Sequence, residues 1–231
     1  MRVAALAALA AVAMLAAPAA SPAQRRASVA QRDWSQVAVR TPEGGVRIGN
    51  PAAPVKLIEY GSITCPHCAA FSGEAAAALR ALYVRPGRVS WEYRPYLIFP
   101  TDPGVFMLLS CLPPSRFFPA AEQLYAMQRD WIGRVQALPE AQLQQLDGLS
   151  PNQRAAALVR AAGLVPFFRA NGLTEPQIDA CLADHAALVR LGDISRNANQ
   201  LGVPGTPTFI INGRMVGTLG WARLEPMLTG G

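Results

Sequence analysis

The sequence predicts an α/β fold that is interrupted by an all-helical lobe. Apolar segments typical of strands lie near both ends of the chain, whereas the middle of the chain places apolar side chains at the spacing of helices. We therefore expect one α/β domain built from residues 46–100 and 186–231. Residues 101–185 should form a helical insertion in that domain.

The first residues have the features of a secretory signal. Arg2 supplies a short positive region, Val3–Ala17 is apolar, and small residues suited to cleavage follow up to Ala23. The apolar core is too short for a comfortable membrane span, although an uncleaved anchor is the alternative. We expect residues 1–23 to be removed on export to the periplasm, an oxidising compartment where disulfides persist.

A polar segment, 24–45, should act as a flexible leader before a short edge strand at 46–48. Removing 23 of 231 residues leaves 208, which is enough for a core with an inserted lobe.

The formal net charge is +6, and almost all the basic residues are arginine, since Lys56 is the only lysine. No basic stripe is interleaved with aromatic residues, so we expect no nucleic-acid partner.

The first β–α–β unit should span residues 55–97. An apolar strand at 55–60 precedes an alanine-rich helix, with Thr64 as the candidate N-cap and Tyr83 near the helix end. A second strand at 89–97 completes the unit. Residues that follow the first strand then lie at its carboxyl end, where open α/β sheets place their sites.

The inserted lobe and the closing elements carry local signals of their own. Helices are expected at 104–112 and 117–129. Ser150–Gln153 and Thr174–Gln177 have the pattern of capping boxes. After a helix at 186–201, the Asn212-Gly213 pair predicts a hairpin of 208–211 with 214–217, and 221–228 should form a short closing helix.

The sequence Cys65-Pro66-His67-Cys68 lies at the predicted strand-to-helix junction. A Cys-x-x-Cys in that position is typical of a thioredoxin-like redox pair. The unpaired N–H groups and partial positive charge of a helix N-terminus stabilise a thiolate, so Cys65 should be the attacking sulfur. A protonated His67 ring adds positive charge nearby and can donate a hydrogen bond. Cys68, one turn further on, can close a disulfide with Cys65.

Other interpretations of this motif are weaker. A structural disulfide over four residues gains little loop entropy. A zinc site lacks a second Cys-x-x-Cys or a His-x₃₋₅-His pair, and haem attachment needs a histidine where Ala69 stands. We expect no metal and no cofactor other than the redox-active disulfide between Cys65 and Cys68.

Two further positions are candidates for the site. Pro207, directly before the predicted hairpin, should follow a cis peptide bond and leave the backbone of Thr206 free to pair with an extended substrate. Glu59 lies six residues before Cys65 on an apolar strand. It is either a buried acid that carries protons to and from Cys68, or a strand acid that faces solvent.

Glu59–Cys68 and Gly202–Gly213, which contain the Cys-Pro-His-Cys and Thr-Pro-Thr motifs, resemble the DsbA-like thiol:disulfide oxidoreductases. The resemblance covers about residues 46–229, including an inserted helical lobe. It implies a periplasmic oxidant that donates its disulfide to unfolded or partly folded secreted proteins. A membrane quinone-linked oxidase would then reoxidise it.

The resemblance also assigns roles to individual residues. It implies that Cys65 attacks, Cys68 resolves, Pro207 is the cis-proline and Glu59 is the buried acid. Cys111 and Cys181 depart from the best-known members of the family. They are either free buried thiols or a structural disulfide in the lobe, and in an exported protein we expect the disulfide.

Three functions remain in competition. The first is an oxidase of secreted proteins, and the second is a reductase or isomerase of the same fold. Isomerases of this family usually carry a dimerisation domain, for which 24–54 is too short, so we expect a monomeric oxidase. The third is a periplasmic metal carrier that uses Cys65, Cys68 and His67.

Overall fold

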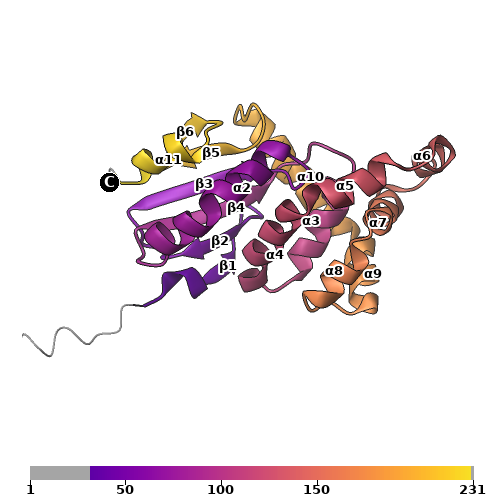
Figure 1. Cartoon of the computed structure of the whole chain (residues 1–231), viewed down its shortest axis with the longest axis horizontal. Helices are drawn as coiled ribbons and strands as arrows, with labels where there is room; N and C mark the ends of the chain where they lie inside the picture. The colour runs from indigo at the N-terminus through magenta and orange to yellow at the C-terminus, as the bar shows by residue number, and fades with distance from the viewer. Residues whose placement is uncertain (1–31, 230–231) are drawn as a thin grey trace, which may run out of the picture. The chain divides into compact units, whose positions relative to one another are not determined.

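The computed structural model describes residues 32–229. The expected signal, residues 1–23, and the first part of the expected leader lie outside this range. A six-stranded sheet with the order β1-β2-β4-β3-β5-β6 forms the centre of the fold (Figure 1). Its strands are β1 (Ala38–Arg40), β2 (Val46–Gly49), β3 (Val55–Gly61), β4 (Val89–Pro95), β5 (Thr208–Ile211) and β6 (Arg214–Gly217).

The two central strands, β3 and β4, are parallel, and the other neighbouring pairs are antiparallel. Parallel neighbours need a crossover connection. That crossover is α2 (Pro66–Ala78), which continues into a π-helical turn, η3 (Leu79–Val84). The predicted β–α–β unit is confirmed, and it places the residues after β3 at the carboxyl end of the central strands.

Helices occupy the chain between β4 and β5. They are α3 (Asp102–Cys111), α4 (Pro114–Ala126), α5 (Gln128–Gln136), α6 (Glu140–Asp147), α7 (Pro151–Ala161), α8 (Val165–Ala170), α9 (Glu175–Ala183) and α10 (His185–Gln200). Helices α3 to α9 gather beside the sheet, and α6 projects away from the strands (Figure 1). The chain then closes with α11 (Trp221–Leu224) and the 3-10 turn η4 (Glu225–Leu228). The α/β fold with an inserted helical lobe is therefore confirmed.

The leader assignment is wrong for its described part. Residues 34–36 form a 3-10 turn, η2, and 38–40 form strand β1, which pairs antiparallel with β2. Because β1 covers β2, the edge of the sheet lies at β1 and not at 46–48 as expected. The local polarity of 24–45 concealed a strand that exists through its pairing with β2.

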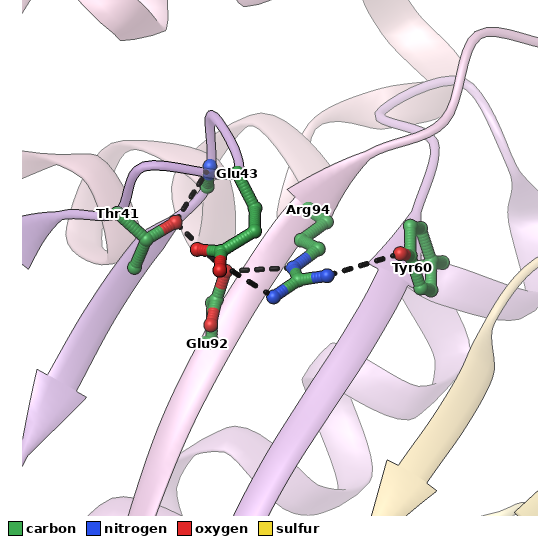
Figure 2. A network of polar contacts seen from close by, with 6 residues as sticks. Thr41, Glu43, Tyr60, Glu92 and Arg94 are labelled. Carbon is green, nitrogen blue, oxygen red and sulfur yellow. Dashed lines mark hydrogen bonds and ion pairs between the residues drawn. The ribbon is translucent and has the colours of Figure 1, made fainter. Parts of the chain in front are cut away.

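A polar network holds the turn after β1 against the sheet (Figure 2). The Thr41 hydroxyl donates to Oε1 of Glu92 at 2.8 Å. Arg94 donates from Nε to the same oxygen at 2.7 Å and from Nη1 to the Tyr60 hydroxyl at 3.2 Å. A wider ion pair joins Arg94 to Glu43 at 3.8 Å. Residues 41–43 are thus bound to β4 and β3, and they belong to the folded domain.

Other local predictions hold with small shifts. Both capping boxes are present, at Ser150–Gln153 and at Thr174–Gln177. The helix expected at 117–129 is divided, because α4 ends at Ala126 and α5 begins at Gln128. Asn212 and Gly213 both have positive φ, 49° and 82°, as a tight hairpin turn requires.

The lobe and the sheet share one hydrophobic core. The Trp91 and Phe118 rings lie 4.5 Å apart, and the Tyr93 and Phe117 rings lie 5.4 Å apart, so α4 packs directly on β4. Trp131 of α5 is completely buried. No helix among residues 32–229 has the length and apolar character needed to cross a membrane.

A disulfide joins Cys111 to Cys181, as the sequence analysis expects. It links the last residue of α3 to α9 across 70 residues of chain, with the two Cα atoms 6.4 Å apart. The bond therefore closes most of the lobe into a loop and reduces the number of conformations that the unfolded chain can adopt.

Replacing both of these cysteines with serine should lower the free energy of unfolding by about 4 kcal/mol, because the closed loop is long. Denaturant unfolding of oxidised protein measures the loss. The difference should disappear when both proteins are unfolded in strong reductant, where neither contains the bond. A double variant as stable as the wild type without reductant would contradict this account.

Candidate active site

The first turn of α2 presents Cys65 as its N-cap residue. Cys65 has extended backbone angles, φ −75° and ψ 121°, and its carbonyl accepts the Ala69 N–H at 3.1 Å. Pro66 follows as the first helical residue. The expectation that Thr64 caps the helix is wrong, because its hydroxyl donates to Oδ1 of Asp102 at 3.0 Å instead. The Cys65 sulfur thus lies where backbone N–H groups of the helix have no partner.

The loop before Cys65 is held by polar side chains of the lobe. Asp102 is completely buried, and its carboxylate accepts the Thr64 N–H at 3.1 Å and the Ser62 hydroxyl at 2.9 Å. Nε2 of Gln128 donates to the carbonyl oxygens of Ile63, at 2.9 Å, and Cys65, at 3.0 Å. The sequence analysis missed Asp102 and Gln128. Asp102 was detectable only as an acid at the start of a helix, and nothing in the sequence connected Gln128 to this loop.

The Cys65 sulfur has an environment that favours the thiolate. The Thr206–Pro207 peptide bond is cis, as expected, and the Thr206 carbonyl accepts a hydrogen bond from the Cys65 thiol at 3.3 Å. The pKa of Cys65 is lowered to about 5, mainly by a hydrogen bond from Cys68. Burial acts against this shift, while Thr206 and the backbone N–H groups of Cys68 and His67 add to it.

Two groups of Thr206 bear on the ionisation of Cys65. Its carbonyl can accept only from the protonated thiol, which opposes ionisation. Its hydroxyl is buried and has no hydrogen-bond partner within residues 32–229. Because a hydroxyl can donate to a thiolate, this group explains how Thr206 lowers the pKa of Cys65.

Cys68 and the two residues between the cysteines differ sharply in exposure. Cys68 is completely buried, whereas Cys65 is 5% exposed and Pro66 and His67 are exposed. Burial raises the pKa of Cys68 well above its usual value, and the charges of Glu59 and Cys65 raise it further. The hydrogen bond expected from the His67 ring is not among those of the described residues. His67 contributes its backbone N–H instead.

Glu59 lies within the core and not on the solvent-facing side of β3. Its side chain is 2% exposed, and its Oε2 accepts the Trp91 indole N–H at 3.0 Å. Burial is the main reason that its pKa rises to about 8. A cavity of about 10 Å³, close to the size of one water, lies between Glu59 and Glu122. Of the two interpretations in the sequence analysis, the solvent-facing acid is therefore wrong.

The structure brings Cys65, Cys68, Glu59 and Thr206 into one site, although they come from β3, α2 and the loop before β5. Within residues 32–229, no three His, Cys, Asp or Glu side chains group so that they could hold a metal ion. The arrangement is thus a dithiol with one acidic and one basic sulfur beside a buried carboxyl group.

Known proteins share this fold. The thioredoxin family model matches residues 41–229. A solved protein-disulfide isomerase from Novosphingobium aromaticivorans is 35% identical, with a TM-score of 0.74 over 79% of this chain and 94% of that one. The alpha-DsbA1 structure from Wolbachia pipientis, 19% identical with a TM-score of 0.60 over 79% of this chain and 88% of that one, shares the fold.

A curated relative from Rickettsia conorii carries the name "Putative protein-disulfide oxidoreductase" and is 22% identical over 184 residues. The match covers 79% of this chain but only 58% of that relative. The chain belongs to the thioredoxin family, and the helical lobe between β4 and β5 gives it the architecture of the DsbA-like members.

Alkylation of the reduced protein should follow the ionisation of Cys65 alone. We expect a half-maximal rate near pH 5, since the pKa of Cys65 is about 5, and no reaction of Cys68 in the same range. Thr206→Val should move the midpoint to higher pH because it removes the donor to the thiolate. Thr208→Val is the matched control, since that hydroxyl donates to the Gly205 carbonyl at 2.7 Å. Equal midpoints for the two variants would contradict the role of Thr206.

Glu59→Gln should stabilise the reduced protein at neutral pH. The carboxyl group ionises near pH 4.5 when unfolded but only near pH 8 when folded, so the native state holds an extra proton between these values. Stability therefore falls as pH rises through this window, by about 3 kcal/mol at pH 7. Denaturant unfolding from pH 4 to 8 should show the variant gaining over the wild type as pH rises. A constant difference would show that Glu59 ionises normally.

Proposed function

We propose that this protein is an exported thiol:disulfide oxidoreductase that donates the Cys65–Cys68 disulfide to secreted protein substrates. The observation that carries the proposal is the contrast between the two sulfurs. The pKa of Cys65 is about 5, whereas that of the buried Cys68 is well above its usual value. A sulfur that is stable as a thiolate is a good leaving group, so a disulfide that contains it is readily given away.

The reaction proceeds in two exchanges. A substrate thiolate attacks Sγ of Cys65, the Cys65–Cys68 bond breaks, and Cys68 leaves with the electron pair. A second substrate thiolate then attacks the substrate sulfur of the mixed disulfide, which forms the substrate disulfide and releases Cys65 as a thiolate. The substrate loses two electrons, and the Cys65–Cys68 pair gains them.

Glu59 serves as the proton donor in the first exchange. A Cys68 thiolate is unfavourable in its buried position, so it must be protonated as it leaves. With a pKa of about 8, Glu59 still holds its proton at neutral pH and can supply it. The small cavity toward Glu122 offers room for a water that returns the proton from solvent.

The partners follow from this chemistry. Unfolded or partly folded secreted proteins are the substrates, and a membrane quinone-linked oxidase restores the disulfide. The protein acts as a monomer in the periplasm after its signal is cleaved. A second candidate is isomerase activity, which the 35% identity to a structure described as a protein-disulfide isomerase favours.

The reduced protein should melt at a higher temperature than the oxidised protein at pH 7. The pKa of Cys65 is about 5 when folded and roughly 8.5 when unfolded, so its ionisation stabilises the reduced fold at pH 7 by about 3 kcal/mol. This contribution is complete above about pH 8.5 and is lost as pH falls through 5. Thermal melts of both forms from pH 4 to 8 test the sign. An oxidised form that melts higher throughout would indicate a reductant.

Cys68→Ala should accumulate mixed disulfides with secreted proteins, because the sulfur that resolves them is missing. Cys65→Ala should accumulate none, since Cys68 is inaccessible. Nonreducing gels followed by mass spectrometry identify the captured proteins.

A measured reduction potential against glutathione separates an oxidant from a reductant. Retention of one copper or zinc ion per reduced protein, without disulfide exchange, would support the metal carrier instead.

A further inference from the structure

A second feature adjoins the dithiol on the side of the lobe. A cavity of about 700 Å³, here called the lobe cavity, lies between the first turn of α2 and helices α5, α6 and α7. Its wall includes the exposed Pro66, the residue after Cys65, and also Gln128, which donates to the Cys65 carbonyl at 3.0 Å. The volume falls within the range of pockets that bind ligands. The cavity therefore adjoins the redox site through Pro66 and Gln128.

One wall of the lobe cavity, formed by α6, carries apolar side chains that are exposed. Helix α6 has eight residues, and none of them is buried. Its Leu143, which is 43% exposed, and Leu146 line the cavity, together with Phe99, which is 52% exposed. An isolated helix of this length is marginal in water, and its apolar side chains are usually covered. An apolar group bound in the cavity would cover these side chains.

The same cavity has a positive charge that is not fully paired. Arg129 lines it and forms no ion pair with any residue between 32 and 229. Arg154 also lines it, with Nη1 3.3 Å from the Asp147 carboxylate. Asp147 lines the cavity as well and already pairs with Arg154. Arg129 is therefore the guanidinium group that a carboxylate in the cavity would pair with.

We propose that the lobe cavity binds an extended segment of the substrate polypeptide that carries a large apolar side chain and an Asp or Glu. The proposal rests on the proposed function, because the segment belongs to the chain whose cysteine bonds to Cys65. An extended chain advances about 3.3 Å per residue, so a segment a few residues from that cysteine reaches a cavity that begins at Pro66. Substrates with this pattern next to a cysteine are oxidised first.

The test compares reduced peptides that contain one cysteine each. The first carries Leu and Asp within a few residues of the cysteine, the second has Ser in place of Leu, and the third has Lys in place of Asp. Stopped-flow measurement of their reaction with the oxidised protein gives second-order rate constants. We expect the first peptide to react about tenfold faster than the second, because one large apolar side chain is buried. Dithiothreitol serves as a small thiol that needs no cavity.

Variants of the protein locate the effect. Leu143→Ser should slow the first peptide by about tenfold while leaving the rate with dithiothreitol unchanged. Leu82→Ser is the matched control, because Leu82 is 57% exposed on η3 and does not line the cavity. Arg129→Glu should reverse the preference between the Asp and Lys peptides.

Equal wild-type rates for the first and second peptides would overturn the proposal, as would a Leu143→Ser protein slowed equally with dithiothreitol. A wild-type dimer that Leu143→Ser dissociates would also overturn it, since the cavity would then hold a second copy. These outcomes leave the proposed function standing if the disulfide still oxidises dithiothreitol. Failure to oxidise any thiol would instead contradict the proposed function itself.

Discussion

The hydrogen bonds between the lobe and residues 62–65 determine where the Cys65 sulfur lies. Asp102 and Gln128 bind both the backbone and the hydroxyl groups of this loop, and every one of these atoms is buried. Burial raises the pKa of Asp102, and no cation pairs with it among the described residues, so neutral donors alone stabilise the charge. The helix terminus can lower the pKa of Cys65 only while the sulfur stays beside the N–H groups of α2, which makes the lobe part of the redox centre.

The site combines two buried ionisable groups with opposite effects on stability. The Cys65 thiolate stabilises the reduced fold at neutral pH, whereas the protonated Glu59 costs free energy relative to its ionised unfolded form. The two effects change over overlapping pH ranges and partly cancel in the reduced protein. In the disulfide form only the contribution of Glu59 remains, so the two redox forms should respond to pH differently.

Sequence reasoning succeeded where a short motif has one physical meaning. The Cys65–Cys68 spacing, the Asn212-Gly213 turn and the capping box at Ser150 each specify local geometry, and each is found in the structure. It failed where a long-range partner decides the outcome. Strand β1 forms because it pairs with β2. Thr64 does not cap α2, because its hydroxyl donates a hydrogen bond to Asp102 instead. The contact of Gln128 with Cys65 spans 63 positions, which no local pattern encodes.

The hydrogen bond between Cys65 and Thr206 spans 141 positions of the chain. During synthesis the Cys-x-x-Cys segment emerges well before the loop that precedes β5. An incomplete chain that stops before this loop lacks Thr206 and the two strands that complete the sheet. Its Cys65 lacks the Thr206 side chain that lowers its pKa, so its sulfur should be less acidic. The environment of the Cys65 sulfur is therefore complete only after the loop before β5 has folded against the first turn of α2.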